Sequence, residues 1–246
     1  CYGYGLFTGG FGLHLGTQRI GATIIPVSSG NTNRQITILK DFGSTVLIST
    51  PSYAMYMSEV AKKEGVSPED IKLRIGLFGS EGCTDELRDK IEKGFGLFST
   101  DNYGMSELNG PGMAGDCVFR NGLHISEDHF LCEIIDPVTG EVLPKGSTGE
   151  LVVTNLTKKG IPMLRYRTKD ITNINYEPCA CGRTTARMHK IIGRSDDMLK
   201  IRGVNVFPTQ IESALIGISQ ISPHYQLVVR REGYADNLEV KVELID

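Results

Sequence analysis

The chain has 246 residues, of which 40% are hydrophobic and 22% are charged, as is usual for a globular protein. Its formal net charge is -3, and it contains no block of five or more basic residues. Because nucleic acids and anionic membranes are bound by basic surfaces, we expect neither as a partner. No apolar run is long enough to cross a bilayer and no secretory leader is recognisable, so we expect a cytoplasmic protein.

Both ends of the sequence have the character of an interior segment. Residue 1 is Cys, and residues 238–244 form an alternating, strand-like run at the other end. We therefore expect the chain to be part of a longer protein.

Residues 1–116 are predicted to form a doubly wound α/β layer, the α/β part of a large N-terminal domain. The strand candidates are the apolar runs at residues 22–27, 45–48, 73–78 and 97–102. Their nearly continuous apolar character suits parallel strands that are buried on both faces. Such sheets bind ligands at the carboxyl ends of their strands, so we expect a site in the loops after Val27, Phe78 and Asn102.

The helices between these strands have recognisable ends. Thr32 and Gln35 have the spacing of a capping box at the start of one helix. A second helix is predicted to open at Thr50, which a proline follows, and a third to begin after Thr84 and end at Gly94.

Residues 117–193 change to short strands and turns, with a clear turn at 136–140 and a β segment at 149–156. They are predicted to form a small β-barrel-like subdomain, or a sandwich, of the same large domain. The polar run at 194–197 marks a domain boundary. Residues 194–246 are expected to be a hinge and the first part of a small α+β C-terminal domain.

Asp170 is the first candidate for a nucleotide contact. It ends an aromatic-Arg-Thr-x-Asp run at residues 166–170. A carboxylate can accept two hydrogen bonds from a vicinal diol such as a ribose. The alternative is an ordinary turn ion pair between Arg167 and Asp170.

The loop at residues 101–107 is a second candidate. Its Tyr103-Gly104 pair would let a flat ring approach the backbone closely. Ser106 and Glu107 can serve phosphate and magnesium, which prefers oxygen ligands. Residues 79–82, at the end of another strand, would form the opposite wall, and a plain Tyr-Gly turn with a surface glutamate is the alternative.

The cysteines give a separate signal. Cys179 and Cys181 are too close in sequence to bridge easily, and cytosolic thiols stay reduced. Together with Cys117 and His124, which flank a predicted hairpin, they make a Cys3His set that suits structural zinc. Buried or idle thiols are the alternative. The spare ligand candidates are Cys132 and His129.

Three runs of the sequence resemble the motifs of the adenylate-forming ligases, and among them the phenylacetate-coenzyme A ligases. They are residues 103–107 (YGMSE), 166–170 (YRTKD) and 193–208 (GRSDDMLKIRGVNVFP). The runs stand in family order at family-like spacing, and further matches at 2–10 and 121–137 extend the resemblance over nearly the whole chain.

This resemblance implies the adenylate-forming fold and an ATP-dependent acid-thiol ligase. An aryl acid such as phenylacetate would attack the α-phosphate of ATP and release pyrophosphate. Coenzyme A would then attack the acyl adenylate to give a thioester. The implied ligands are therefore ATP or AMP, Mg²⁺, coenzyme A and the aryl carboxylate, and a homodimer stays open.

The resemblance also implies roles for single residues. Tyr103 would stack on adenine, Glu107 would lie on the magnesium side, and Asp170 would bind the ribose. Arg194 would lie beside the ribose or phosphate, and Asp196 would be the pivot of the small domain. The implied nucleotide and coenzyme A contacts are Gly79, Ser80, Glu81, Asp101, Asn102, Tyr103, Gly104, Met105, Ser106, Asp170, Arg194 and Gly203.

Tyr2 and Phe7 resemble part of the family's aryl pocket. The family's lysine-bearing phosphate loop and its C-terminal catalytic lysine are not in this sequence, and the glycines at 9, 10 and 12 suit helix packing instead. We therefore expect this chain alone not to complete the adenylation. Two other functions stay open: an adenylating enzyme that loads a carrier protein, and a zinc-stabilised nucleotide-binding module without catalysis.

Overall fold

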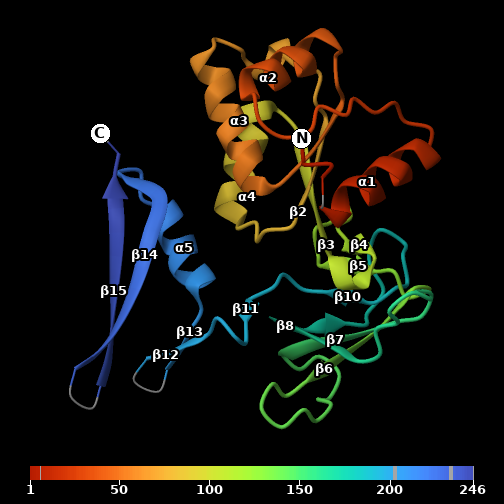
Figure 1. Cartoon of the computed structure of the whole chain (residues 1–246), viewed down its shortest axis with the longest axis vertical. Coiled ribbons are helices and arrows are strands. Elements are labelled where there is room, and N and C mark those ends of the chain that lie inside the picture. The colour runs from red at the N-terminus through yellow and green to blue at the C-terminus, as the bar shows by residue number, and fades with distance from the viewer. Residues whose placement is uncertain (6, 202–203, 233–234, 246) are drawn as a thin grey trace.

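The computed structural model describes residues 1–5, 7–201, 204–232 and 235–245 (Figure 1). A mixed seven-stranded sheet runs through its larger part in the order β1-β2-β3-β4-β5-β10-β9. Strands β1, β2 and β3 are parallel, and each later strand is antiparallel to its neighbours. The strands are β1 (Val46–Ser49), β2 (Ile75–Gly79), β3 (Phe98–Met105), β4 (Gly110–Gly115), β5 (Leu123–Ile125), β9 (Ile174–Asn175) and β10 (Arg187–Met188).

The helices of this part are α1 (Thr8–Arg19), α2 (Thr32–Asp41), α3 (Pro51–Lys63) and α4 (Asp85–Phe95), with the short 3-10 helices η1 (Pro68–Asp70) and η2 (Ser106–Leu108). A core between α2, α3, α4 and the parallel strands buries Leu47, Met57, Phe78, Ile91 and Phe95. Burying each such side chain stabilises the fold by about 1.5–3 kcal/mol. Helix α1 packs on β4, where a Cβ on Gly12 would lie 3.6 Å from Pro111, so Gly12 serves helix packing as predicted. Gly9 and Gly10 instead leave room for the Phe7 and Tyr2 rings.

Two of the predicted helix starts are confirmed. The Thr50 side chain accepts a hydrogen bond from the backbone of Tyr53 at the start of α3. Thr84 accepts one from Leu87 at the start of α4. These caps satisfy backbone N–H groups that have no partner within the helix.

The predicted end of α4 at Gly94 is wrong. The helix continues to Phe95, and Gly96 follows in the left-handed conformation with φ 65°. Gly94 lies inside the helix, where an added Cβ would come within 2.9 Å of the Ser58 Cβ on α3. Its small size therefore permits close packing of the two helices.

The capping box predicted from Thr32 is also wrong. The cap of α2 is Asn31, whose side chain accepts a hydrogen bond from Arg34 N. The buried Gln35 amide instead donates to the carbonyls of Ser28 and Gly30, and so holds the preceding turn. Residues 22–27, predicted as a strand, are not in a strand.

A second sheet is antiparallel and has the order β11-β8-β7-β6. It shares a core with the antiparallel half of the first sheet, to which Met113, Ile125, Leu151 and Met188 contribute. Strands β5, β9 and β10 belong to the first sheet although they follow residue 116, so that sheet crosses the predicted subdomain boundary. The strands of the second sheet are β6 (Phe130–Ile135), β7 (Gly149–Asn155), β8 (Tyr166–Thr172) and β11 (Gly193–Arg194).

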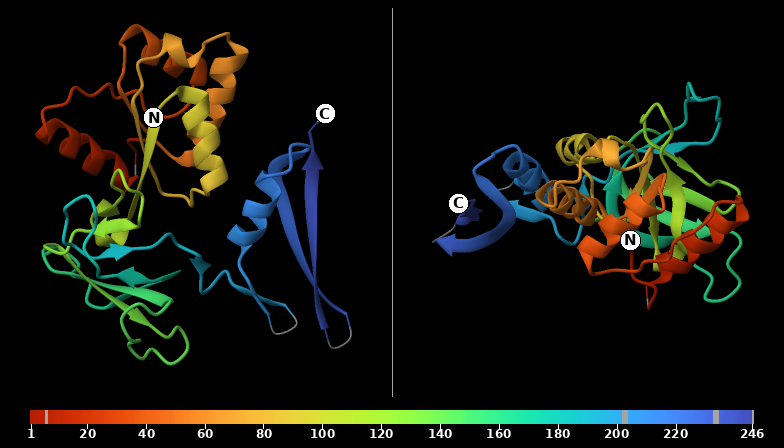
Figure 2. Two further views of the ribbon diagram at one scale, coloured as in Figure 1. Left: turned by 180° about the vertical axis from the view of Figure 1, so that it is seen from behind. Right: turned by 90° about the horizontal axis from the view of Figure 1, so that it is seen from above.

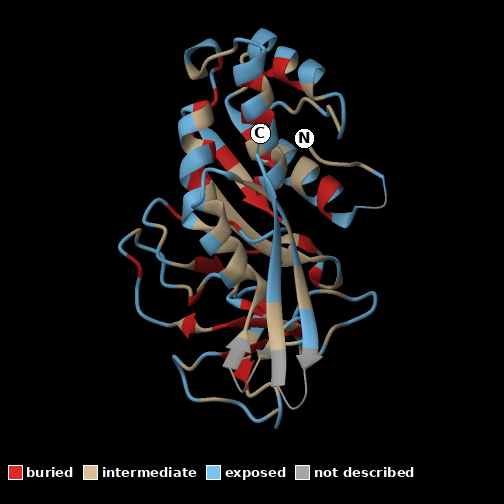
Figure 3. Ribbon diagram, turned by 90° about the vertical axis from the view of Figure 1, so that its left-hand side faces the viewer, coloured by how far each residue is buried: buried red, intermediate tan, exposed pale blue. Residues whose placement is uncertain are grey.

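The C-terminal part contains α5 (Pro208–Ile216), β12 (Leu199–Ile201), β13 (Val204–Val206), β14 (Ile221–Glu232) and β15 (Ala235–Leu244). It stands beside the larger part, next to α4, in Figures 1 and 2. Lys90 Nζ on α4 donates to the Ile216 carbonyl at the end of α5, 3.1 Å away. Among the residues after Gly193 whose burial the structure describes, all are exposed or half-buried, whereas buried residues gather in the larger part (Figure 3).

None of the described helices combines the length and the apolar character that crossing a bilayer requires.

Candidate active site

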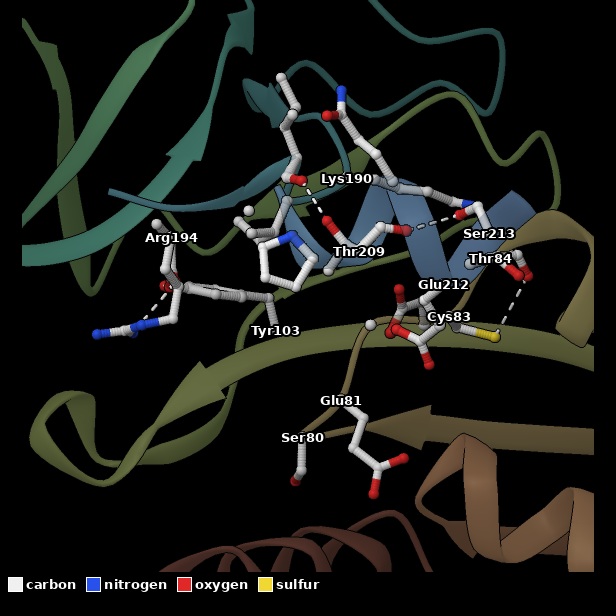
Figure 4. A pocket seen from close by; sticks show the side chains of 18 of the residues that line it. Ser80, Glu81, Cys83, Thr84, Tyr103, Lys190, Arg194, Thr209, Glu212 and Ser213 are labelled. Carbon is white, nitrogen blue, oxygen red and sulfur yellow. Dashed lines mark hydrogen bonds and ion pairs between the residues drawn. The ribbon is translucent and has the colours of Figure 1, made fainter. Parts of the chain in front are cut away.

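A cavity of about 740 Å³ lies at the carboxyl ends of β2 and β3 and is closed on one side by α5 (Figure 4). Its size suits a small-molecule ligand, and its place is the one that the α/β pattern predicts. The predicted residues that line it are Ser80, Glu81, Asp101, Asn102, Tyr103, Gly104, Met105, Asp170 and Arg194. The predicted residues outside its lining are Gly79, Ser106, Glu107, Asp196, Tyr2 and Phe7. Gly203 lies outside the described residues.

Asp170 joins the two sheets at the cavity wall. Its side chain accepts a hydrogen bond from the Tyr103 hydroxyl, with 2.5 Å between Oδ2 and Oη. Its other oxygen lies 3.4 Å from Arg194 Nη1. Burial raises the pKa of Asp170, although the hydrogen bond from Tyr103 and the charge of Arg194 act in the opposite direction. The alternative pairing with Arg167 does not form, because Arg167 binds Glu150.

Arg194 links Asp170 to the polar run that follows β11. Its Nε and Nη2 donate to the two carboxylate oxygens of Asp196, at 3.0 and 2.8 Å. Its Nη1 also donates to the Thr168 carbonyl at 3.3 Å. The guanidinium is therefore fixed at the cavity wall while 40% of the side chain stays exposed.

The segment after β2 and the end of β3 meet at the cavity as predicted, although residues 101–105, predicted as part of a loop, belong to β3. The loop predicted after Val27 contributes none of the described residues that line the cavity. Asn102 Nδ2 donates to the Phe78 carbonyl at 2.5 Å, which ties the two strand ends together. Glu81 accepts hydrogen bonds from the backbone and hydroxyl of Ser52, at the start of α3. A Cβ on Gly104 would collide with the Gly110 carbonyl, so this glycine is required by the close approach of β4 to β3.

Ser106 and Glu107 lie on η2, directly after the cavity-lining Met105. The Glu107 backbone carbonyl accepts a hydrogen bond from Lys158 Nζ at 2.8 Å. Its half-buried carboxylate lies close enough to Tyr166 to contribute to the raised pKa of that phenol, of which burial is the main cause.

Tyr2 and Phe7 form a separate aromatic cluster before α1. Their ring centroids lie 6.4 Å apart, and Tyr2 also contacts Tyr4 at 5.3 Å. A Cβ on Gly10 would touch the Tyr2 ring at 3.4 Å. Neither ring is part of the cavity lining.

Several cavity residues were missed in the sequence. Lys190 and Asp85 form an ion pair with 2.5 Å between Nζ and Oδ1. From α5 the cavity receives Thr209 and Glu212, and the hydroxyl of Thr209 donates to the Ile192 carbonyl. Asp85 lies three residues after the predicted loop 79–82, so a wider search around that loop would identify it. No motif near Lys190 or Glu212 indicates a ligand site.

Asp101 is a carboxyl group of the cavity lining whose pKa is raised. Desolvation raises its pKa to about 6, although Arg88 opposes the shift. Beneath it, Asp116 accepts hydrogen bonds from Arg88 Nη2 at 3.1 Å and from the Asp101 backbone at 3.2 Å.

The four predicted metal ligands come together. The ligand atoms of Cys117, His124, Cys179 and Cys181 all lie within 4.8 Å of one another. Cys117 Sγ and Cys179 Sγ are 3.8 Å apart, and Cys181 Sγ lies 3.3 Å from His124 Nε2. Thr185 Oγ1 binds the other ring nitrogen of His124 at 3.1 Å.

The spare ligands lie elsewhere. His129 binds Thr157 and Asp128, and it is not part of the cluster. Burial raises the pKa of Cys132 to about 12, as expected for a thiol in apolar surroundings.

Comparison with known proteins identifies the family of this chain. The family model described as AMP-binding enzyme matches residues 7–157, and the one described as AMP-binding enzyme C-terminal domain matches residues 203–246. Phenylacetate-coenzyme A ligases are similar over 99% of this chain: the one from Thermus thermophilus is 53% identical, and those from Pseudomonas putida and Escherichia coli are 51% and 47% identical. The chain spans about 55% of the length of these relatives.

Solved structures show the same fold in two arrangements. A 2-hydroxyisobutyryl-CoA ligase in the postadenylation state, in complex with 2-HIB-AMP, matches 99% of this chain and 53% of its own, with a TM-score of 0.90 at 29% identity. The same enzyme in the thioesterification state, with CoA, matches with a TM-score of 0.77 at the same identity and coverage.

Proposed function

The chain belongs to the AMP-binding enzyme family, and from this we infer that it carries the nucleotide site of an ATP-dependent ligase that joins an aryl acid, phenylacetate, to coenzyme A. The observation that carries the proposal is the Tyr103-Asp170-Arg194 contact at the wall of the cavity. Similarity to phenylacetate-coenzyme A ligases at about 50% identity supports the choice of acid and thiol.

Asp170 is proposed to bind the ribose of ATP. Each carboxylate oxygen offers two acceptor sites, and here Tyr103 and Arg194 each occupy one. The remaining lone pairs can accept the two ribose hydroxyls. The hydrogen bond from Tyr103 also fixes the orientation of its ring, so that the ring can stack on adenine without further ordering.

Arg194 is proposed to stabilise the phosphate. In the first step the acid's carboxylate oxygen bonds to the α-phosphorus of ATP, and the bond to the bridging oxygen breaks to release pyrophosphate. In the second step the coenzyme A sulfur bonds to the acyl carbon, and AMP leaves. A guanidinium held by Asp170 and Asp196 places a fixed positive charge beside the cavity, where negative charge develops on phosphate oxygens.

Glu107 is proposed to serve Mg²⁺. The ion usually takes one or two carboxylates, several waters and the phosphates of its nucleotide, so one glutamate next to the cavity fits this requirement. Mg²⁺ would neutralise charge on the phosphates. Tyr2 and Phe7 are proposed to contact the aryl group, since their clustered rings supply an apolar surface for it.

The Cys3His cluster is proposed to hold a structural zinc ion. A tetrahedron with Zn–S bonds of about 2.3 Å has S···S edges of about 3.8 Å, and the Cys117–Cys179 separation is 3.8 Å. Thr185 holds the His124 ring with Nε2 toward Cys181, the kind of support that metal-bound histidines have. Four protein ligands leave no open position, so the ion would join the turn at Cys117 to the turn at Cys179 and take no part in the reaction.

The full-length protein provides the test. We expect phenylacetate to drive exchange between ATP and pyrophosphate, and coenzyme A to convert the adenylate into phenylacetyl-coenzyme A and AMP. If exchange occurs but the acyl group is transferred only to a carrier-protein thiol, the acceptor is that thiol and not coenzyme A. AMP binding without exchange, tested with aryl and aliphatic acids, would instead identify a non-catalytic nucleotide-binding module.

A further inference from the structure

Strand β8 carries a bulge directly before Asp170. In its pairing with β7, Ile171 lies opposite Glu150, and Arg167 lies opposite Val152. One residue of β7, Leu151, therefore faces residues 168–170 of β8. Lys169, in the middle of the bulge, has φ 69°, a left-handed conformation that is unfavourable for a residue with a side chain.

Glu150 holds this bulge from the side away from the cavity. Its side chain is fully buried, yet it does not line the cavity. Its carboxylate accepts Arg167 Nε at 3.0 Å, Arg167 Nη2 at 2.6 Å and the Lys169 backbone N–H at 3.3 Å. The Lys169 ammonium lies 3.9 Å away. Burial would raise the pKa of Glu150, but the hydrogen bonds and charge of Arg167 outweigh it and the pKa is lowered.

The other side of the bulge holds the nucleotide residues. The Thr168 carbonyl accepts Arg194 Nη1 at 3.3 Å, and the Lys169 carbonyl accepts the Ser195 backbone N–H at 2.7 Å. Asp170 itself pairs with Arg194 across the β8-β11 ladder. One strained segment thus sets the positions of Asp170 and Arg194 together.

We propose that Glu150 is a positioning residue for nucleotide binding: it holds Lys169 in its left-handed conformation and so directs Asp170 and Arg194 toward the cavity. A bulge changes the direction of the side chains beside it, and a strained backbone persists only where its surroundings fix it. The Glu150 carboxylate supplies that restraint through Lys169 N–H and the Arg167 fork. The inference rests on the proposed nucleotide site.

The test is AMP binding by the full-length protein, measured by isothermal titration calorimetry. Glu150→Gln keeps the shape but turns one acceptor into a donor facing Arg167, and we expect it to weaken AMP binding roughly tenfold or more. Glu133→Gln is the matched control. Glu133 pairs with Arg165 at 3.0 Å on the same sheet, away from the bulge, and its variant should bind AMP like the wild type.

Two further variants separate positioning from general stability. In an Asp170→Ala background, Glu150→Gln should cause a clearly smaller loss of AMP affinity than in the wild type, because only the part that acts through Arg194 remains. Adding Lys169→Gly to Glu150→Gln should restore much of the affinity, because glycine adopts a positive φ without strain. If Glu150→Gln does not fold alone, Arg167→Lys, which loses the two-pronged contact, should show the same non-additivity with Asp170→Ala.

The outcomes are distinct. Wild-type affinity in Glu150→Gln, or equal losses with and without Asp170, would overturn the positioning role and leave the proposed function intact. Absence of AMP binding in the wild type would overturn the proposed function itself.

Discussion

Asp101 provides a pH-dependent test of the cavity floor. Its pKa in the folded chain is about 6, above the value of 3.8 for a free side chain, because desolvation disfavours the charged form. The negative charge therefore costs stability, and the contribution of Asp101 to stability should rise as the pH falls from about 6 toward 4. Asp101→Asn removes the charge. We expect it to raise the melting temperature at pH 7.5, with the difference vanishing near pH 4.

Asp136 is a matched control of opposite sign. Backbone hydrogen bonds from Thr139 and Val138 lower the pKa of Asp136. Its stabilisation is present above the unfolded pKa and is lost as the pH falls through the folded one. Asp136→Asn should therefore lower the melting temperature at neutral pH. A destabilised Asp101→Asn at pH 7.5, or a difference that does not change with pH, would contradict the assignment of Asp101.

Single residues were predictable where the chemistry is local to one motif. Asp170 and Tyr103 were identified from their runs and Arg194 from the family resemblance, and all three line the cavity. Their contacts were not predicted, because Tyr103 and Asp170 are 67 residues apart. The sequence alternative paired Arg167 with Asp170, but the bulge at Lys169 directs the two side chains to different partners.

At the scale of elements, we predict that a zinc ion joins the turns that carry Cys117 and Cys179. We expect about one equivalent of zinc in protein purified without added metal, and its loss in a Cys179→Ser Cys181→Ser double variant. Loss of the zinc should lower the melting temperature of the protein, since a structural metal contributes folding free energy directly. Elemental analysis by mass spectrometry measures the metal.

Cys132→Ser is the control for this experiment. Cys132 lies outside the ligand cluster, so its replacement should leave the zinc content unchanged. Wild-type protein without zinc, or a double variant that retains it, would refute the site.

Elements were predictable where the end of a helix has its own side-chain cap. Thr50 and Thr84 cap their helices through a hydrogen bond that lies within four residues. The failed cases depend on distant parts of the chain. Residues 22–27 are apolar but pair with no strand, and Gly94 serves packing against Ser58 and does not end its helix.

At the scale of the whole molecule, Asp196 is proposed as the pivot between the larger part and the C-terminal part. It lies in the run that joins them, and it is tied to Arg194 by two hydrogen bonds. The fold matches the postadenylation arrangement of a related ligase better than its thioesterification arrangement. Asp196→Pro would fix φ near -65°. We expect it to affect the two half-reactions of the full-length enzyme very unequally, because each needs its own arrangement.

Asp196→Ala distinguishes the role of Asp196 as a pivot from its role in the ion pair with Arg194. It removes the contact with Arg194 but leaves φ free, so it should affect both half-reactions more evenly than the proline variant. Pyrophosphate exchange and transfer from preformed acyl adenylate to coenzyme A are measured separately. Equal losses in Asp196→Pro would count against the pivot.

The division of the chain was predictable only in part. The change from helices to short strands after residue 116 is real, but strand pairing carries the first sheet beyond it into β5, β9 and β10. Composition detects a change of element type, whereas sheet membership depends on contacts between distant residues. The domain boundary at the polar run 194–197 stays a prediction, and the four residues of this run are half-buried or exposed.

The most direct test of the nucleotide site is the affinity of the full-length protein for AMP with and without Asp170. Removing a charged acceptor of the ribose hydroxyls costs about 1.5–3 kcal/mol per bond. Asp170→Ala should therefore weaken AMP binding by roughly tenfold or more and raise the KM for ATP, with Asp170→Asn intermediate. Unchanged affinity for AMP and an unchanged KM for ATP in Asp170→Ala would contradict the account.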